Sequence, residues 1–231
     1  MKRVKLFLWV AILCTSCSTS KFLTSDVKSV EVTEVLKIEP FSYISLIESG
    51  NKGVFNDSIS SSTKIVLNES LEAFREKLRL SSGEVVISDS LEREKLEKEL
   101  SFLILSADRN RNIKNLPITP LIDSLLTANE KRFGLFIVQS GFTRAKGNYG
   151  GQVAKGVGMG ILTGVLTMGM VSVYQTPIKS NSTLYAMIID NQNKSVAFYN
   201  KSVLQDKEPT DKENIMKQLN KIFEKYFWEK K

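Results

Sequence analysis

Two kinds of hydrophobic spacing divide most of the chain into predicted strands and helices. Strands are predicted where apolar residues alternate or where β-branched and aromatic residues cluster: 30–38, 41–47, 84–87, 133–143, 183–189 and 195–199. Helices are predicted where apolar residues recur three and four positions apart: 63–78, 90–105, a helix beginning at 119–120 and a helix from 210 onward. The polar stretches 51–62 and 107–116 are predicted to be loops.

Capping signals support three of the helices. Ser88-Asp89 precedes the helix at 90, and Thr119-Pro120 places proline at the first helical position. Thr210-Asp211-Lys212-Glu213 has the spacing of a capping box. The apolar positions of the last helix fall on one side, at Ile215, Leu219, Ile222, Phe223, Tyr226 and Phe227.

The order of elements predicts an α+β fold, with a small mixed sheet and helices packed on it. The runs 183–189 and 195–199, joined by Asp190 to Lys194, predict a hairpin before the last helix. A Gly-rich apolar insertion, 150–176, precedes that hairpin. A length of 231 residues suits one domain, and we expect a signal peptide at 1–16, a tether at 17–29 and a single domain at 30–231.

The first residues have the layout of a secretory signal peptide. Lys2, Arg3 and Lys5 precede the apolar run 6–13, and Cys14-Thr15-Ser16-Cys17 resembles a bacterial lipobox with Cys17 as the lipidated residue. Cys14 fits less well, since bulky Leu13 would lie at its cleavage site. The alternative is that both cysteines are ordinary thiols in an uncleaved anchor. Ser18 and the lack of an acidic cluster after it favour the outer membrane, with the domain facing the periplasm.

The chemical inventory excludes several kinds of active site. Histidine is absent, so a Ser-His-Asp or Cys-His centre and imidazole-held zinc are ruled out. Acylation of Cys17 would leave no other cysteine in the processed chain. Loss of residues 1–16 would reduce the net charge from +7 to +4, without the basic block that nucleic-acid binding requires. We therefore expect no enzyme activity, no cofactor, no metal and no nucleic-acid partner.

The remaining acidic residues have ordinary interpretations. Asp190 ends a predicted strand and could lie in a cleft, but a turn residue is the favoured interpretation. Asp108, with two arginines nearby, is expected in a solvated loop. Four glutamates of the predicted helix 90–105 are expected to form a solvated face rather than a metal cluster. They are Glu92, Glu94, Glu97 and Glu99.

The insertion 150–176 allows three structures. Residues 156–174 carry no charge, and as a helix they would reach about 28 Å, close to the thickness of a bilayer core. Gly156, Gly160 and Gly164 form a GxxxGxxxG stripe, with Gly169 further along, so a helix could insert in the membrane or pack on copies of itself. Local alternation of glycine with Val157, Met159 and Ile161 instead allows a hairpin. The third alternative is an apolar excursion packed on the domain.

The element order resembles the α/β module of envelope lipoproteins such as the curli-secretion channel CsgG, the N-terminal domain of TolB and the peptidoglycan-synthase activator LpoB. The runs 41–46, 84–96 and 133–141 correspond to a first core strand, a strand followed by a charged helix, and the next core strand. The resemblance covers about residues 40–228. It implies no catalytic residues and a role in binding other proteins and assembling at the envelope. The channel member uses two membrane hairpins, whereas only one candidate segment is found here.

These observations predict a non-catalytic, lipid-anchored envelope lipoprotein. We expect it to bind the membrane through acylated Cys17 and to bind other envelope proteins or copies of itself. The alternative is an oligomeric outer-membrane transport or secretion channel component that inserts its Gly-rich segment.

Overall fold

The computed structural model describes residues 22–50, 52–147, 171–173 and 178–228. Its strands are β1 (Leu23–Thr24), β2 (Val35–Ile38), β3 (Phe41–Ile47), β4 (Lys52–Phe55), β5 (Leu80–Val85), β6 (Phe133–Arg144), β7 (Val171–Val173), β8 (Asn181–Asp190) and β9 (Ser195–Gln205). Its helices are η2 (Ser29–Glu31), α2 (Asp57–Ala73), α3 (Arg75–Leu78), α4 (Ser90–Asn110), α5 (Pro120–Ala128) and α7 (Lys212–Phe227).

The strands of the described residues form one mixed sheet, which confirms the predicted α+β class. The order is β1-β9-β8-β6-β3-β4-β7, with β2 also beside β6 and β5 beside β2. Strands β2 and β3 run parallel to β6, whereas β8 and β9 form the predicted antiparallel hairpin. Strand β8 extends past the predicted run 183–189 at both ends, and β9 extends past the predicted run 195–199 at its carboxyl end.

The sheet forks at Glu39-Pro40. Strands β2 and β3 follow each other along one side of β6, from Phe133 to Arg144. Proline has no N–H for the ladder, so strand pairing is interrupted at this point. Strand β5 pairs with β2 before the break, whereas β4 pairs with β3 after it. The two outer strands diverge at this point, and the fork positions the cleft beside Glu39 that is described below.

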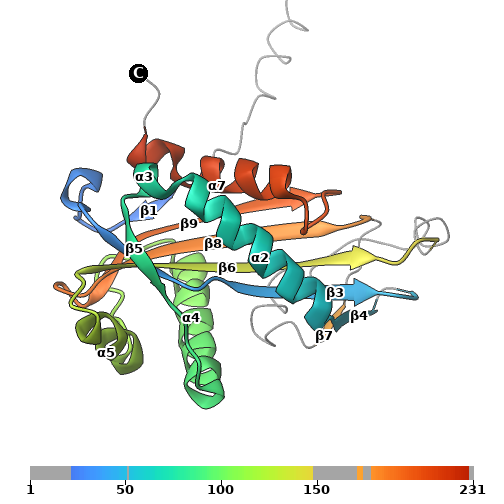
Figure 1. The fold of residues 1–231 in the computed structure, drawn as a ribbon, viewed down its shortest axis with the longest axis horizontal. Coiled ribbons are helices and arrows are strands. Elements are labelled where there is room, and N and C mark those ends of the chain that lie inside the picture. The colour runs from blue at the N-terminus through green and yellow to red at the C-terminus, as the bar shows by residue number, and fades with distance from the viewer. Residues whose placement is uncertain (1–21, 51, 148–170, 174–177, 229–231) are drawn as a thin grey trace, which may run out of the picture.

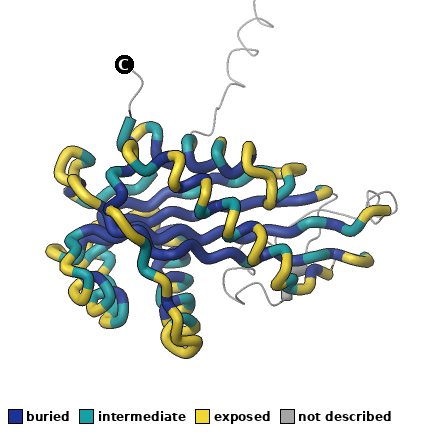
Figure 2. Tube along the Cα trace, viewed as in Figure 1, coloured by how far each residue is buried: buried dark blue, intermediate teal, exposed yellow. Residues whose placement is uncertain are grey.

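Helices cover both faces of the sheet (Figure 1). On one face α2 and α7 pack over a core that includes Leu67, Leu71, Ile137, Leu219 and Phe223. On the other face α4 and α5 cover a second core, which includes Leu100, Ile104, Ile122, Phe136 and Met187. Figure 2 shows the strands buried between these layers and the outward faces of the helices exposed. The apolar stripe predicted for the last helix is the side of α7 that faces this core.

Both predicted polar loops contain regular structure. Residues 51–62 hold β4 and the first turns of α2, because the Asn56 side chain accepts a hydrogen bond from Ile59 N and caps the helix. Residues 107–116 contain the end of α4, which reaches Asn110 with Ala107 buried. The sequence predicts a strand at 84–87, whereas β5 spans Leu80–Val85 and therefore begins and ends earlier than expected.

The fold begins earlier in the chain than expected. Leu23 and Thr24 pair with Tyr199 and Phe198 of β9, and Val27 is buried in the core under α2 and α7. These residues of the predicted tether 17–29 are therefore part of the fold. Residues 30–34 are not part of a strand, since β2 starts at Val35.

The predicted capping box does not form at the last helix, whose N-cap lies one residue later than expected. Asp211, not Thr210, is the N-cap, and its carboxylate accepts hydrogen bonds from Glu213 N and Asn214 N. None of the helices in the described ranges combines the length and apolar character needed to cross a bilayer.

Candidate functional site

Several predicted site residues lie outside the described residues. These are Cys17, the signal peptide, and the glycines 156, 160, 164 and 169 of the insertion. The described flanks of the insertion lie close together in the sheet, since Phe142 at the end of β6 pairs with Asn181 at the start of β8. Within the insertion, Val171 to Val173 form β7 and pair with β4.

Asp190 is a structural turn residue, as the favoured interpretation predicted. Its fully buried carboxylate accepts two hydrogen bonds from Arg132, Nε to Oδ1 at 3.0 Å and Nη2 to Oδ2 at 2.9 Å. It also accepts from Gln192 N and from the backbone and side-chain nitrogens of Asn193. The carboxylate therefore fixes the β8–β9 turn, and its lone pairs are used within the fold.

Asp108 does not lie in a solvated loop. It belongs to the last turn of α4 and accepts a hydrogen bond from Tyr199 Oη at 2.8 Å, and it pairs with Lys201 Nζ. Burial raises the pKa of the Tyr199 phenol, and the negative charge of Asp108 raises it further. The contact joins α4 to β9, although Asp108 and Tyr199 are 91 residues apart in the sequence.

The acidic face of α4 is only partly solvated. Glu92 is exposed and Glu94 pairs with Lys98 in solvent, as expected. Glu97 and Glu99 are half-buried, because Glu97 pairs with Arg93 and Glu99 accepts from Thr119 Oγ1. Among the described residues no group of three or more carboxylates, histidines or cysteines is placed to hold a metal ion.

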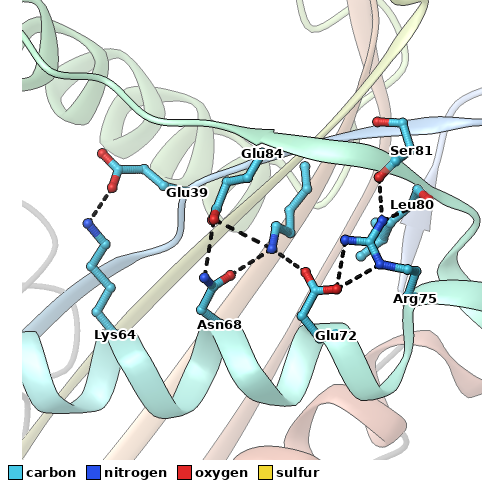
Figure 3. Close-up of polar contacts among 9 residues, drawn as sticks. Glu39, Lys64, Asn68, Glu72, Arg75, Leu80, Ser81 and Glu84 are labelled. Atoms are coloured by element: carbon cyan, nitrogen blue, oxygen red, sulfur yellow. Dashed lines mark hydrogen bonds and ion pairs between the residues drawn. The ribbon is translucent and has the colours of Figure 1, made fainter.

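A charged layer lies between α2 and the strands β2 and β5 (Figure 3). Lys37 of β2, whose side chain is only 3% exposed, is at its centre. Its ammonium donates to Asn68 Oδ1 at 2.8 Å, pairs with Glu72, and lies 3.6 Å from Glu84. Asn68 in turn donates to Glu84 at 3.2 Å. The lysine is thus held by α2 and β5 together.

Glu39 lies at the fork itself. Its side chain is 4% exposed and pairs with Lys64 of α2 and with Arg93 of α4. It also accepts from Ile87 N at 3.3 Å. Since these partners come from both helix layers, the carboxylate joins the two faces at the point where the sheet opens. The guanidinium of Arg93 also lies over the Phe41 ring, 4.9 Å from its centroid.

A cleft of about 600 Å³ opens beside this ion cluster. Hydroxyl groups and charges line it: Ser42, Tyr43, Asp57, Ser60, Ser61, Lys64, Arg93, Glu94 and Glu97, with Phe55. Ser42 Oγ is buried with no hydrogen-bond partner among the described residues, whereas the buried Tyr43 Oη faces the carboxylate of Glu97. Burial raises the pKa of Tyr43, and the charge of Glu97 raises it further, so the phenol stays protonated and neutral. The cleft is therefore lined mainly by hydroxyl and charged groups, with a neutral phenol at Tyr43.

Aromatic side chains gather at the end of the molecule where the described chain begins and ends. The Phe22 ring lies 6.1 Å from Tyr226 and 6.0 Å from Phe198. Trp228 stacks on Phe74 with ring centroids 5.5 Å apart. Tyr226 Oη donates to Val27 O at 3.1 Å, and burial raises the pKa of Tyr226 to about 12. The first and last described residues are thus part of one cluster.

The sequence analysis missed Lys37 and Glu39. A signal for Lys37 was present, since it stands between Leu36 and Ile38 in a strand whose four residues are all buried. A charge at such a position requires a partner, but the partner residues lie 25 to 54 positions away and could not be named.

No family model and no curated protein matches this sequence. Among solved structures it is similar to a PelC dodecamer from Paraburkholderia phytofirmans, with a TM-score of 0.36 and 7% identity over 92% of this chain and 99% of that chain. A point variant of the same dodecamer gives a TM-score of 0.35 and 7% identity, over 89% of this chain and 94% of the other.

Proposed function

We propose that this protein is a lipid-anchored, non-catalytic envelope lipoprotein that binds or assembles with other envelope proteins. Cys17 carries the lipid, and the domain lies on the periplasmic side of the outer membrane. In this proposal the lipid anchor at Cys17 is followed within a few residues by the folded domain.

The observation that carries this proposal is the short distance along the chain from Cys17 to the fold. Phe22 packs on Phe198 and Tyr226, only five residues after the lipobox cysteine. Five residues span at most about 18 Å even when fully extended. A lipid on Cys17 therefore holds the domain against the membrane surface. Several acyl chains on one residue give lasting attachment, since each buried methylene contributes about 0.8 kcal/mol.

The acidic residues that might have served catalysis support the non-catalytic part of the proposal. Asp190 fixes a turn, Asp108 joins α4 to β9, and Glu39 joins α2 to α4. Each carboxylate is bound by cationic or hydrogen-bonding groups of this same domain. Its burial therefore does not require a bound substrate.

The outer face of α4 supports a binding role. Leu91 is 75% exposed and Phe102 is 61% exposed on this helix. The two side chains lie on the same side of α4, because eleven residues make about three helical turns, and this side is open to a partner protein.

Acylation of Cys17 is tested by expressing the full chain and its Cys17→Ser variant in bacteria, then measuring the intact mass of the membrane fraction. We expect the parent protein to lose residues 1–16 and gain acyl chains, and the variant to do neither. Cys14→Leu is the matched control, because it removes the other thiol and places at the first lipobox position the residue most often found there, and it should be processed like the parent. Acylation that survives in Cys17→Ser would overturn the assignment.

The second candidate is a transport channel, favoured by the uncharged stretch 156–174 and its glycine stripe. The mass of the acylated protein in mild detergent, corrected for bound detergent, separates the two. A discrete ring of many copies supports the channel, and Gly160→Leu should then abolish assembly or conductance. A monomer or dimer supports the adaptor, in which Gly160→Leu should lower stability and leave the oligomeric state unchanged.

A further inference from the structure

Some side chains at the aromatic end of the domain reach the molecular surface. We use the name aromatic end for Phe22, Val30, Phe74, Phe227 and Trp228. Phe22, Phe227 and Trp228 are only partly buried, and Val30 of η2 is 71% exposed. The Phe227 ring makes a T-shaped contact with Tyr226 at 5.0 Å and lies 6.4 Å from Trp228. The aromatic end therefore presents apolar area to its surroundings while its inner side packs on the core.

Cationic side chains surround these rings. Lys77 Nζ lies 5.8 Å from the Phe74 centroid and 5.6 Å from that of Trp228, and Arg79 lies over Phe227 at 5.7 Å. A lysine with its ammonium close to aromatic rings at the surface can reach a phosphate while its stem covers apolar area.

A groove of about 460 Å³ runs between residues 22–29 and the last turn of α7. Phe22, Tyr226 and Phe227 line it, and exposed Lys28 and Lys225 come from its two sides. Asp26, also in the lining, pairs with Lys114 at 2.7 Å. The groove thus combines an apolar floor with two ammonium groups that have the chemistry to bind a phosphate.

We propose that the aromatic end is the surface by which this domain lies on the lipid bilayer, with Trp228 and Phe227 among the lipid headgroups. The inference rests on the proposed acylation of Cys17. A lipid on that residue brings the bilayer within about 18 Å of Phe22. Tryptophan, aromatic rings and lysine are the side chains that favour the interface between hydrocarbon and water.

This placement decides which face of the sheet is free for partners. The aromatic end belongs to the layer of α2, α3 and α7, whereas α4 and α5 cover the opposite face (Figure 1). With the aromatic end on the bilayer, Leu91 and Phe102 of α4 lie on the layer away from it.

Tryptophan fluorescence tests the proposal directly. The chain has two tryptophans, Trp9 and Trp228, and removal of residues 1–16 leaves Trp228 as the single reporter. The acylated protein is reconstituted in vesicles of phosphatidylethanolamine and phosphatidylglycerol, either ordinary or with brominated acyl chains. We expect a loss of Trp228 emission in the brominated vesicles and a shift to shorter wavelength on binding.

The matched control moves the reporter to the other helix layer, in the acylated double variant Trp228→Phe, Phe102→Trp. Its emission should be the same in both kinds of vesicle. Equal emission of the parent in both vesicles, with the protein floating with them, would overturn the assigned surface and leave the anchor intact. A mature protein without acyl chains that fails to float would instead overturn the proposed function and this inference with it.

Discussion

Arg132 holds the buried carboxylate of Asp190 through two parallel hydrogen bonds, 3.0 and 2.9 Å long. The same guanidinium lies 4.6 Å from the centroid of the Phe133 ring. Asp190 raises the pKa of the Arg132 guanidinium through this hydrogen bonding, so the guanidinium stays charged. One arginine thus fixes both the start of β6 and the turn between β8 and β9.

Arg132→Met is expected to lower the free energy of unfolding by about 3 kcal/mol, because it leaves a buried charge without its counter-ion. Urea denaturation followed by circular dichroism measures the change. Lys98→Met, which breaks the solvent-exposed pair with Glu94, is the control and should change stability little. Equal stabilities of the two variants would contradict a structural role for Arg132.

Two buried hydroxyl groups should respond differently to their removal. Tyr199 Oη donates to Asp108, whereas Ser42 Oγ has no hydrogen-bond partner in the described part of the chain. Tyr199→Phe should therefore cost about 1 kcal/mol, and Ser42→Ala should be neutral or stabilising. Thermal unfolding of both variants against the parent checks the order, and a larger loss in Ser42→Ala would show that its hydroxyl has a partner.

The charged layer under α2 predicts a dependence of stability on acid. The hydrogen bond from Lys37 lowers the pKa of Glu72 below its usual 4.5. The stability that this pair contributes is therefore fully present above pH 4.5 and is lost as the pH falls through the lowered pKa. The side chain of Glu72 is 40% exposed, so solvent screening keeps the effect modest.

Glu72→Gln removes this contribution, so the dependence of the unfolding free energy on pH should be flatter below pH 4.5 than in the parent. Urea titrations from pH 6 downward measure it. Parallel curves for variant and parent would show that the ion pair has no linkage to folding.

Gly141 permits the close approach of β6 and β8 beside the insertion. A Cβ on this residue would lie 2.2 Å from the backbone oxygen of Asn181. Gly141→Ala should therefore force the strands apart, at a cost of about 2 to 3 kcal/mol. In Gly134→Ala the clash would be with the side chain of Leu126, which can rotate, so the loss should be smaller. Thermal unfolding compares the two, and the reverse order would contradict the packing described here.

Local signals accounted for most of the elements. The aromatic and β-branched run Phe41–Ile47 is β3 with the predicted ends, Pro120 begins α5, and the apolar stripe of α7 faces the core as its spacing indicated. These features depend on neighbours within about four residues. The chain itself therefore specifies them, and the lipobox around Cys17 is a pattern of the same local kind.

Long-range contacts accounted for the rest. Lys37 and Glu39 are buried because Glu72, Lys64 and Arg93 reach them from helices 25 to 54 residues away. Asp108 is taken from solvent by Tyr199 and Lys201, about ninety residues further along. The sequence around a charged residue does not indicate which distant residue will pair with it. Only the packing of α2 and α4 on the forked sheet brings opposite charges close enough to offset the loss of water. Only the docking of Phe22 on Tyr226 joins the two ends of the described domain.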